Sequence, residues 1–160
     1  MHLQTTNYQL QTKRGFTLIE LLVMLAVMGA IVTFAEPMLS SFMFSQDAST
    51  SAAGAVDALR QAQSATMAGK SPGRWGVHFE TNRYVLFQGA AYSGGVPENL
   101  THELSAGVTV TGISLSGGGS DVHFADHRGV PTEAGTVTFT AATGKTNTVT
   151  VGAAGMFDSN

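Results

Sequence analysis

The order of apolar and polar positions divides the chain into an apolar run, an amphipathic stretch and a region of alternating residues. A polar leader, residues 1–15, carries the basic pair Lys13 and Arg14, and residues 16–35 are then almost uniformly apolar. Twenty helical residues extend about 30 Å, which matches the hydrocarbon thickness of a bilayer. Eleven of the twenty are Leu, Ile, Val or Phe, and they favour insertion by about 3–6 kcal/mol. We therefore predict a transmembrane helix over residues 16–38, with the leader in the cytoplasm.

The helical pattern continues past the apolar run as an amphipathic stretch, residues 39–70. Its apolar residues recur at spacings that place them on one helical face: Leu39, Phe42, Ala52, Ala53, Val56, Leu59, Ala62 and Met67. Pro37 precedes this stretch. Because proline lacks an N–H and clashes with the carbonyl of the preceding turn, we predict a bend there rather than a stop. A cluster of glycine, serine and proline at residues 69–73 ends the helical pattern.

From residue 71 onward apolar and polar residues alternate, which indicates β-strands. The predicted strands are residues 75–79, 84–88, 108–115, 122–124, 137–140 and 148–151. The first two and the last two of these strands form hairpins, and residues 89–107 are predicted to be a loop. The predicted fold class is α+β, in which a long N-terminal helix packs on antiparallel sheets of one β-rich domain, residues 71–160.

Glu20 interrupts the apolar run, and its charge needs an explanation. A carboxylate at mid-bilayer costs about 2.5–3.5 kcal/mol, and less near the end of a span. One interpretation is a cleavable signal peptide, for which residues 33–35 offer a small-x-small site, although the run exceeds the usual apolar region of about 7–15 residues. A second is a plain single-pass anchor, which gives Glu20 no role. A third follows from a family resemblance.

Residues 15–23, Gly-Phe-Thr-Leu-Ile-Glu-Leu-Leu-Val, resemble the cleavage and methylation motif of type IV pilin-like proteins. The resemblance implies that prepilin peptidase cuts between Gly15 and Phe16 and N-methylates Phe16. It also implies that Glu20 pairs with the new amine of a neighbouring subunit, which sets the register of assembly. Pro37 corresponds to the helix-bending proline of many pilins. Even if the resemblance holds, a Glu20 side chain that merely reaches toward the membrane interface remains an alternative.

The β-rich region resembles the GspH/FimT-like branch of minor pilins and type II secretion pseudopilins. The residues that carry this resemblance are 73–79, 84–87, 122–124, 129–131, 135–139, 149–151 and Gly155. It implies a structural subunit of a type IV pilus or a type II secretion pseudopilus, with other pilin subunits and prepilin peptidase as partners. The implied location is the inner membrane, single-pass, with the N-terminus in the cytoplasm and residues 71–160 outside, and then the filament.

Charge and composition exclude several other functions. Without residues 1–15 the chain has 6 Lys and Arg against 11 Asp and Glu, which argues against a general nucleic-acid binder. Some FimT-like relatives bind DNA through C-terminal arginines, but residues 154–158 here contain no arginine and one acid. A pilus-tip module for DNA or a surface ligand is the alternative function, with Arg74, Arg83 and Arg128 as its candidate patch. The chain has no cysteine, which rules out a disulfide or a thiol nucleophile.

The remaining polar residues do not form a pattern that predicts chemistry. His123 and His127 lie near Asp121 and Asp126, but a metal site needs three or four converging ligands, and this segment is predicted to be a strand followed by a turn. By alternation we expect His78 and His123 to face solvent. We expect Trp75 to be the main aromatic residue of the core. No catalytic, cofactor-binding or metal-binding residue is predicted, and the protein is not expected to be an enzyme.

Overall fold

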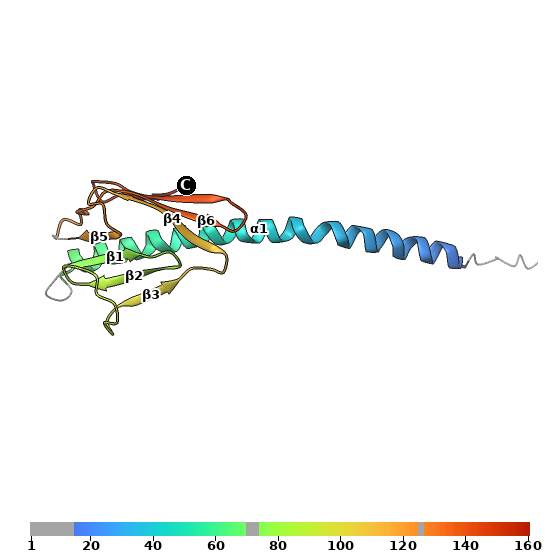
Figure 1. Ribbon diagram of the computed structural model, residues 1–160, viewed down its shortest axis with the longest axis horizontal. Coiled ribbons are helices and arrows are strands. Elements are labelled where there is room, and N and C mark those ends of the chain that lie inside the picture. Colours follow the sequence, from blue (N-terminus) through green and yellow to red (C-terminus); the bar gives the residue numbers. More distant parts are fainter. Residues whose placement is uncertain (1–14, 70–73, 125–126) are drawn as a thin grey trace, which may run out of the picture. The chain divides into compact units, whose positions relative to one another are not determined.

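The computed structural model describes residues 15–69, 74–124 and 127–160, and the side chains of residues 34–45 lie outside this description. The described chain contains one α-helix, α1 (Leu18–Met67), and two four-stranded antiparallel sheets (Figure 1). It divides into two compact units, residues 1–38 and residues 39–160. The predicted α+β class and the predicted antiparallel sheets are therefore confirmed.

The first unit contains the N-terminal part of α1. Among the described residues, no helix has both the length and the apolar character that crossing a membrane requires. Residues 34–38 of the predicted span lie outside the described side chains, as does Pro37, whose predicted bend stays a prediction. The basic leader pair, Lys13 and Arg14, also lies outside the described residues.

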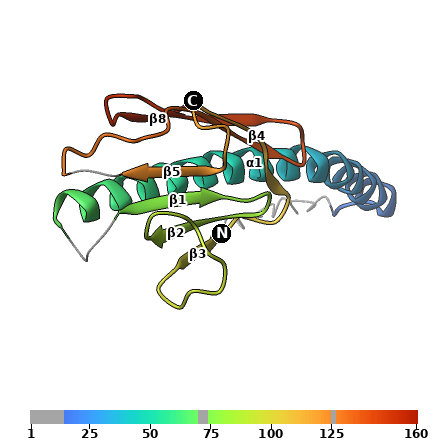
Figure 2. The same ribbon diagram turned by 60° about the vertical axis from the view of Figure 1, so that its left-hand side comes forward.

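The second unit contains the C-terminal part of α1 and all eight described strands. The strands are β1 (Trp75–Phe79), β2 (Arg83–Gln88), β3 (Leu100–Glu103), β4 (Val108–Leu115), β5 (Asp121–Phe124), β6 (Gly135–Ala141), β7 (Thr146–Val151) and β8 (Phe157–Ser159). Sheet A has the order β3-β2-β1-β5, and sheet B has the order β4-β6-β7-β8. The chain passes from sheet A to sheet B and back, so neither sheet is a continuous stretch of sequence (Figure 2).

The strand registers confirm the two predicted hairpins. In β1 and β2, Phe79 pairs with Tyr84 and Trp75 with Gln88, while β6 and β7 pair from Thr140–Thr146 at one end to Gly135–Val151 at the other. The β1–β2 turn also joins the two sheets, because the N–H of Val110 in β4 donates to the carbonyl of Thr81 over 2.8 Å. The tip of this hairpin therefore fixes the position of sheet A against sheet B.

The predicted loop over residues 89–107 is wrong in part, because it contains strand β3. This strand reads Leu-Thr-His-Glu and shows no alternation of burial, since three of its four residues are exposed. It forms the edge of sheet A and pairs only with β2. A short edge strand can be held by backbone pairing with its neighbour, here β2, without an apolar pattern of its own.

Small residues of α1 allow the helix backbone to lie close to both sheets. Ala48, Ala52, Ala55, Ala58 and Ala62 are buried in one cluster with residues of sheet A and sheet B. Alanine also has the highest helix propensity, so the same residues favour the helix and the close approach. Most exposed positions of this stretch are polar, as the amphipathic pattern predicted, but Ala53 and Met67, which were predicted on the apolar face, are exposed as well.

Phe79, Phe124 and Phe139, together with Tyr84, form the aromatic part of the core cluster, and Phe87 is buried on the opposite face of sheet A. The fully buried aromatic side chains are Phe79, Phe87, Phe124 and Phe139, whereas Trp75 is only partly buried and packs against the edge of the cluster. The expectation that Trp75 is the main core aromatic is therefore wrong. The backbone N–H of Trp75 donates to the hydroxyl of Thr66 over 3.2 Å, which places this residue at the C-terminal end of α1.

Candidate functional site

The predicted cleavage site lies directly before the first turn of α1. Gly15, Phe16 and Thr17 precede the helix, and Phe16 is 79% exposed. A Cβ atom built on Gly15 would meet no atom within 4 Å, so the backbone on this side of the bond is open. A peptidase needs an accessible peptide bond, and the bond between Gly15 and Phe16 lies outside the helix between two exposed residues.

Thr17 caps the helix through the backbone N–H of Glu20. The N–H of Glu20 donates to the hydroxyl oxygen of Thr17 over 3.2 Å, and the N–H of Leu21 donates to the Thr17 carbonyl over 3.2 Å. Thr17 is thus the N-cap and Glu20 the third helical residue, which is the spacing of a capping box. A carboxylate in the first turn also interacts favourably with the helix dipole. Sequence reasoning missed the role of Thr17, although Thr-x-x-Glu before an apolar run is a recognised start signal.

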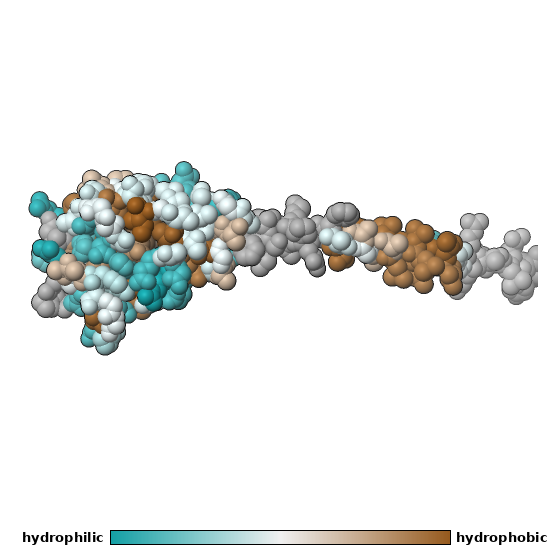
Figure 3. Space-filling view, viewed as in Figure 1, coloured by the Kyte–Doolittle hydropathy of each residue, from teal (hydrophilic) through white to brown (hydrophobic). Residues whose placement is uncertain are grey.

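The helical surface that follows Glu20 is apolar around its whole circumference. Eleven large apolar side chains between Leu18 and Val32 are each about half exposed or more: Leu18, Ile19, Leu21, Leu22, Val23, Met24, Leu25, Val27, Met28, Ile31 and Val32. Figure 3 shows the first turns of this stretch in brown and paler patches farther along the helix. The hydroxyl of Thr33 donates to the carbonyl of Gly29 over 2.9 Å, so this polar side chain is satisfied within the helix. A helix that is apolar on every side requires cover from other apolar groups.

The cap, the open bond and the apolar surface coincide with a known sequence motif. Residues 10–35 match the prokaryotic N-terminal methylation motif. This motif is typical of type IV pilin-like proteins, and it implies processing by prepilin peptidase and assembly with other pilins. No curated protein and no solved structure gives a significant match to the chain. The matched segment includes Gly15, Phe16 and Glu20 and ends two residues before Pro37.

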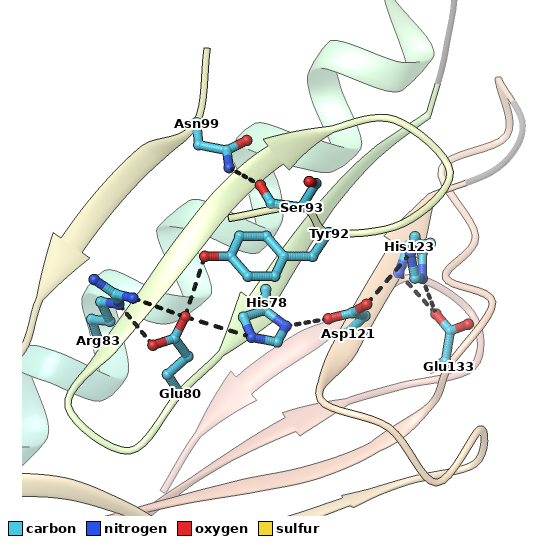
Figure 4. A network of polar contacts seen from close by, with 9 residues as sticks. All are labelled: His78, Glu80, Arg83, Tyr92, Ser93, Asn99, Asp121, His123 and Glu133. Carbon is cyan, nitrogen blue, oxygen red and sulfur yellow. Dashed lines mark hydrogen bonds and ion pairs between the residues drawn. The ribbon is translucent and has the colours of Figure 1, made fainter. Parts of the chain in front are cut away.

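The histidines that the sequence placed in solvent are instead partly buried in a polar cluster on sheet A. The side chains of His78 and His123 point away from α1 as alternation predicted, but they are only 20% and 15% exposed. The reason is that Tyr92, from residues 89–99, stacks on His78 (Figure 4), while His123 lies against Phe87 and Glu133. Val85 and Phe87 lie under the same cover and are buried. The expectation of solvent exposure for the two histidines is therefore wrong.

A signal for this cover is present in the sequence. Residues 84–87 read Tyr-Val-Leu-Phe without a polar break. A strand with one solvated face alternates, whereas an unbroken apolar strand is buried on both faces. Tyr84 and Leu86 face the core and Val85 and Phe87 face the covering segment, so all four are buried.

Two carboxylates of the polar cluster have lowered pKa values. Hydrogen bonds from the Arg83 guanidinium to Glu80, at 2.8 and 3.2 Å, lower the pKa of Glu80 despite its partial burial. Burial raises the pKa of Glu133, but hydrogen bonds from the backbone N–H of His123 and the hydroxyl of Thr132 outweigh this effect, so the pKa is lowered overall. Both side chains are thus carboxylates at neutral pH.

The residues that the sequence analysis considered as metal ligands do not lie around one point in the described chain. His127 Nδ1 lies 3.1 Å from the carbonyl of Thr66 at the end of α1, whereas His123 contacts Glu133. Asp126 lies outside the described residues, and the described residues contain no group of three or more side chains that could hold a metal ion. Arg83 belongs to the candidate DNA patch. Its guanidinium is hydrogen-bonded to the Glu80 carboxylate, and its Nη1 lies 3.9 Å from Glu103 Oε1. Its charge is therefore already compensated within the chain.

Gln63 of α1 forms hydrogen bonds to two turns that connect the strands. The sequence analysis did not identify this residue. Gln63 Nε2 donates to the carbonyl of Gly129 over 2.6 Å and to the carbonyl of Gly155 over 3.0 Å. Both glycines have positive φ angles, 70° and 80°. A Cβ atom on Gly155 would lie 2.5 Å from the Gly129 carbonyl oxygen, so this close approach requires glycine. No local pattern marks such a residue, because its partners lie 66 and 92 positions away.

Proposed function

We propose that this protein is a GspH/FimT-like minor pilin or pseudopilin, a structural subunit without enzymatic activity of its own. The observation that carries the proposal is the methylation motif over residues 10–35, followed by a helix that is apolar on all sides. In the proposed pathway the precursor is anchored in the inner membrane through residues 16–38. Prepilin peptidase then removes residues 1–15 and methylates Phe16.

Assembly exchanges lipid contacts of the apolar helix for contacts with the helices of other subunits. Such an exchange needs no net hydrophobic gain, because lipid tails and apolar side chains are equally apolar, and packing and polar pairs decide the association. The first-turn carboxylate, Glu20, supplies the polar pair with the methylated amine of a neighbouring Phe16. A buried ion pair of this kind contributes more to alignment than to stability.

Mass spectrometry of the N-terminus tests the processing step. The full chain is expressed with and without an active prepilin peptidase, and the N-terminal peptide of the membrane fraction is sequenced. The proposal expects a chain that begins at N-methylated Phe16 only when the peptidase is active. A chain that begins at Glu36 would favour the signal-peptide interpretation, and a retained leader in assembled material would refute the proposal.

Substitution of Glu20 tests the assembly step separately. Glu20→Val removes the charge and keeps the side chain apolar, so the variant should be processed and retained in the membrane but should enter filaments poorly. Glu20→Asp keeps the carboxylate on a side chain that is one methylene shorter, so this variant should enter filaments better than Glu20→Val. Normal incorporation of the valine variant would exclude the amine as the partner of Glu20.

A further inference from the structure

The outer face of sheet B consists mainly of threonine. The apolar residues of β6 and β7 lie in the core, so the residues between them point to the opposite face of the sheet. On both strands each of these outward residues is a threonine, and they pair across the strands as Thr136–Thr150, Thr138–Thr148 and Thr140–Thr146. Strand β4 adds Thr109, which pairs with Thr140. Figure 2 shows sheet B on one side of α1, and we name its face away from the helix the threonine face.

The threonine face carries no charged side chain on β4, β6 and β7. These strands contain no Asp, Glu, Lys or Arg, although an edge strand such as β4 is commonly protected by charged residues. The β-branch of threonine restricts its side-chain rotation, and a contact of 2.7 Å between the hydroxyls of Thr111 and Thr140 holds these two groups further. The hydroxyls therefore form an ordered array, with spacings of about 4.8 Å between strands and about 6.7 Å along them. A partner that binds this array orders few additional groups, which lowers the entropic cost of binding.

The array continues into a hollow at the turn between β7 and β8. Asp158 pairs with Thr150, so both side chains belong to the threonine face. The N–H of Gly152 donates to the carbonyl of Met156 over 2.8 Å, which extends this pairing by one more outward pair. A hollow of about 480 Å³ is lined by Thr150, Gly152, Met156, Phe157 and Asp158. Met156 is 75% exposed, the highest value among the described large apolar side chains of the second unit. The hollow thus offers an apolar surface next to a carboxylate and the hydroxyl array.

The size and chemistry of the threonine face fit an uncharged polymer better than a protein or a nucleic acid. Four strands and three rows of outward residues cover about 400 Å², whereas a stable protein interface buries about 800 Å² on each partner. Binding energy between proteins also comes mainly from Trp, Tyr and Arg, and threonine is under-represented among such residues. A nucleic acid would require Lys or Arg for its phosphates. Hydroxyl groups both donate and accept hydrogen bonds, so an array of them matches another surface that is rich in hydroxyls.

We propose that the threonine face binds a neutral polysaccharide. The sugar hydroxyls exchange hydrogen bonds with the threonine hydroxyls, and the Asp158 carboxylate accepts a further one. The C–H face of one sugar ring packs on Met156, whose flexible and polarisable side chain adapts to the shape of its partner. This inference does not rest on the proposed pilin function, because it concerns the strands of sheet B and not the N-terminal helix. In an assembled filament this face would give the subunit an affinity for a carbohydrate surface.

Affinity electrophoresis of the full chain in a mild uncharged detergent tests the proposal. The chain migrates through native gels that contain the neutral polymers hydroxyethylcellulose, dextran or galactomannan, and through a gel that contains the polyanion polygalacturonate. Relative to a marker protein that binds none of them, the chain should migrate more slowly in at least one neutral gel than in a polymer-free gel, and polygalacturonate should not slow it. Unchanged migration in all three neutral gels would overturn the proposal, and so would retardation by polygalacturonate alone.

Variants show whether the threonine face is responsible for the retardation. Thr136→Val combined with Thr150→Val keeps the approximate side-chain volume and removes two paired hydroxyls, so the Kd for the retarding polymer should rise about tenfold. Thr101→Val is the matched control, because Thr101 is exposed on β3 of sheet A, and its Kd should equal that of the wild type. An unchanged Kd in the double variant, or an equal rise in Thr101→Val, would overturn the proposal.

Two further measurements close the remaining alternatives. Met156→Ala should raise the Kd several-fold, and an unchanged Kd in this variant decides against the proposal if the double variant does not fold. Sedimentation velocity in the same detergent tests a second copy of the chain as the occupant. A wild-type dimer that the double variant loses would assign the threonine face to contact between copies and would overturn the polysaccharide site.

Discussion

Replacement of Gln63 by leucine tests how the helix holds the β-region. The substitution keeps the approximate volume and removes the amide that donates to the carbonyls of Gly129 and Gly155. A typical hydrogen bond contributes about 0.5–1.5 kcal/mol net, and a buried acceptor left without a partner costs about 1–3 kcal/mol. Gly129 is buried, whereas Gly155 is partly exposed and can bind water after the substitution. We therefore expect Gln63→Leu to lower the free energy of unfolding by about 2–4 kcal/mol.

Urea unfolding followed by tryptophan fluorescence measures this change. The chain has one tryptophan, Trp75, which lies beside the end of α1 and reports the second unit. Gln61→Leu is the matched control, because Gln61 lies on the same helix, is exposed and should change stability by less than about 0.5 kcal/mol. A loss below about 1 kcal/mol in Gln63→Leu, or equal losses in the two variants, would refute the role of Gln63.

Gln63→Glu adds a pH signature to the same test. A carboxylate cannot donate, so at neutral pH it would face two carbonyl oxygens, and we expect this variant to be less stable than Gln63→Leu. A protonated carboxyl group regains one O–H donor. The instability of Gln63→Glu relative to the wild type should therefore decrease as the pH falls through the titration of the new side chain. A pH-independent difference would show that the side chain turns away from the two glycine turns.

Three further predictions concern other parts of the described chain. Gly76→Ala should destabilise by about 1–3 kcal/mol in urea unfolding, because a Cβ atom there would lie 2.7 Å from the Phe87 ring and 2.8 Å from a backbone oxygen. Glu133→Gln should lower stability at pH 7. The pKa of Glu133 is lower in the folded than in the unfolded chain, so its carboxylate stabilises the fold at pH values above the ordinary value of 4.5. This stabilisation is lost as the pH falls through the pKa of the folded state. The free energies of unfolding of the wild type and Glu133→Gln should therefore converge in acid. Thr17→Ala should speed amide exchange at Glu20, whose N–H bonds the Thr17 hydroxyl, whereas Thr17→Asp should preserve it.

The sequence predicted those strands well whose order of apolar and polar residues matches which of their side chains are buried. Strands β1, β6 and β7 alternate apolar and polar residues, β2 is apolar almost throughout, and short turns join the strands of each hairpin, so both pairings follow from local chemistry. Edge strands β3 and β8 were missed, because Leu-Thr-His-Glu and Phe-Asp-Ser carry little apolar pattern of their own. Their position depends on the free edges of β2 and β7, which only the folded sheets provide.

The candidate site also has one part that is continuous in the sequence and one part whose residues lie far apart in the sequence. The motif around Gly15, Phe16 and Glu20 is continuous in sequence, so the predicted cleavage and assembly residues could be named from the sequence alone. The polar cluster of sheet A joins His78 in β1 to Asp121 in β5, which is 43 positions away. Alternation gave the correct face for His78, but its partners on that face come from β5 and from Tyr92 in residues 89–99, so the burial of His78 could not be derived from its own strand.

The helix cap bears on what Glu20 requires in the proposed filament. The first-turn position gives its charge a favourable interaction with the helix dipole of about 0.3–1 kcal/mol. That is less than the cost of about 2.5–3.5 kcal/mol for a carboxylate deep in hydrocarbon, so the cap lowers the demand for a cation but does not remove it. In the proposed pathway the dipole therefore offsets part of the cost of Glu20 in the membrane-bound monomer, and the uncompensated part of the charge favours a neighbour that brings an amine. On this basis Glu20→Val should weaken assembly and leave retention in the membrane unchanged.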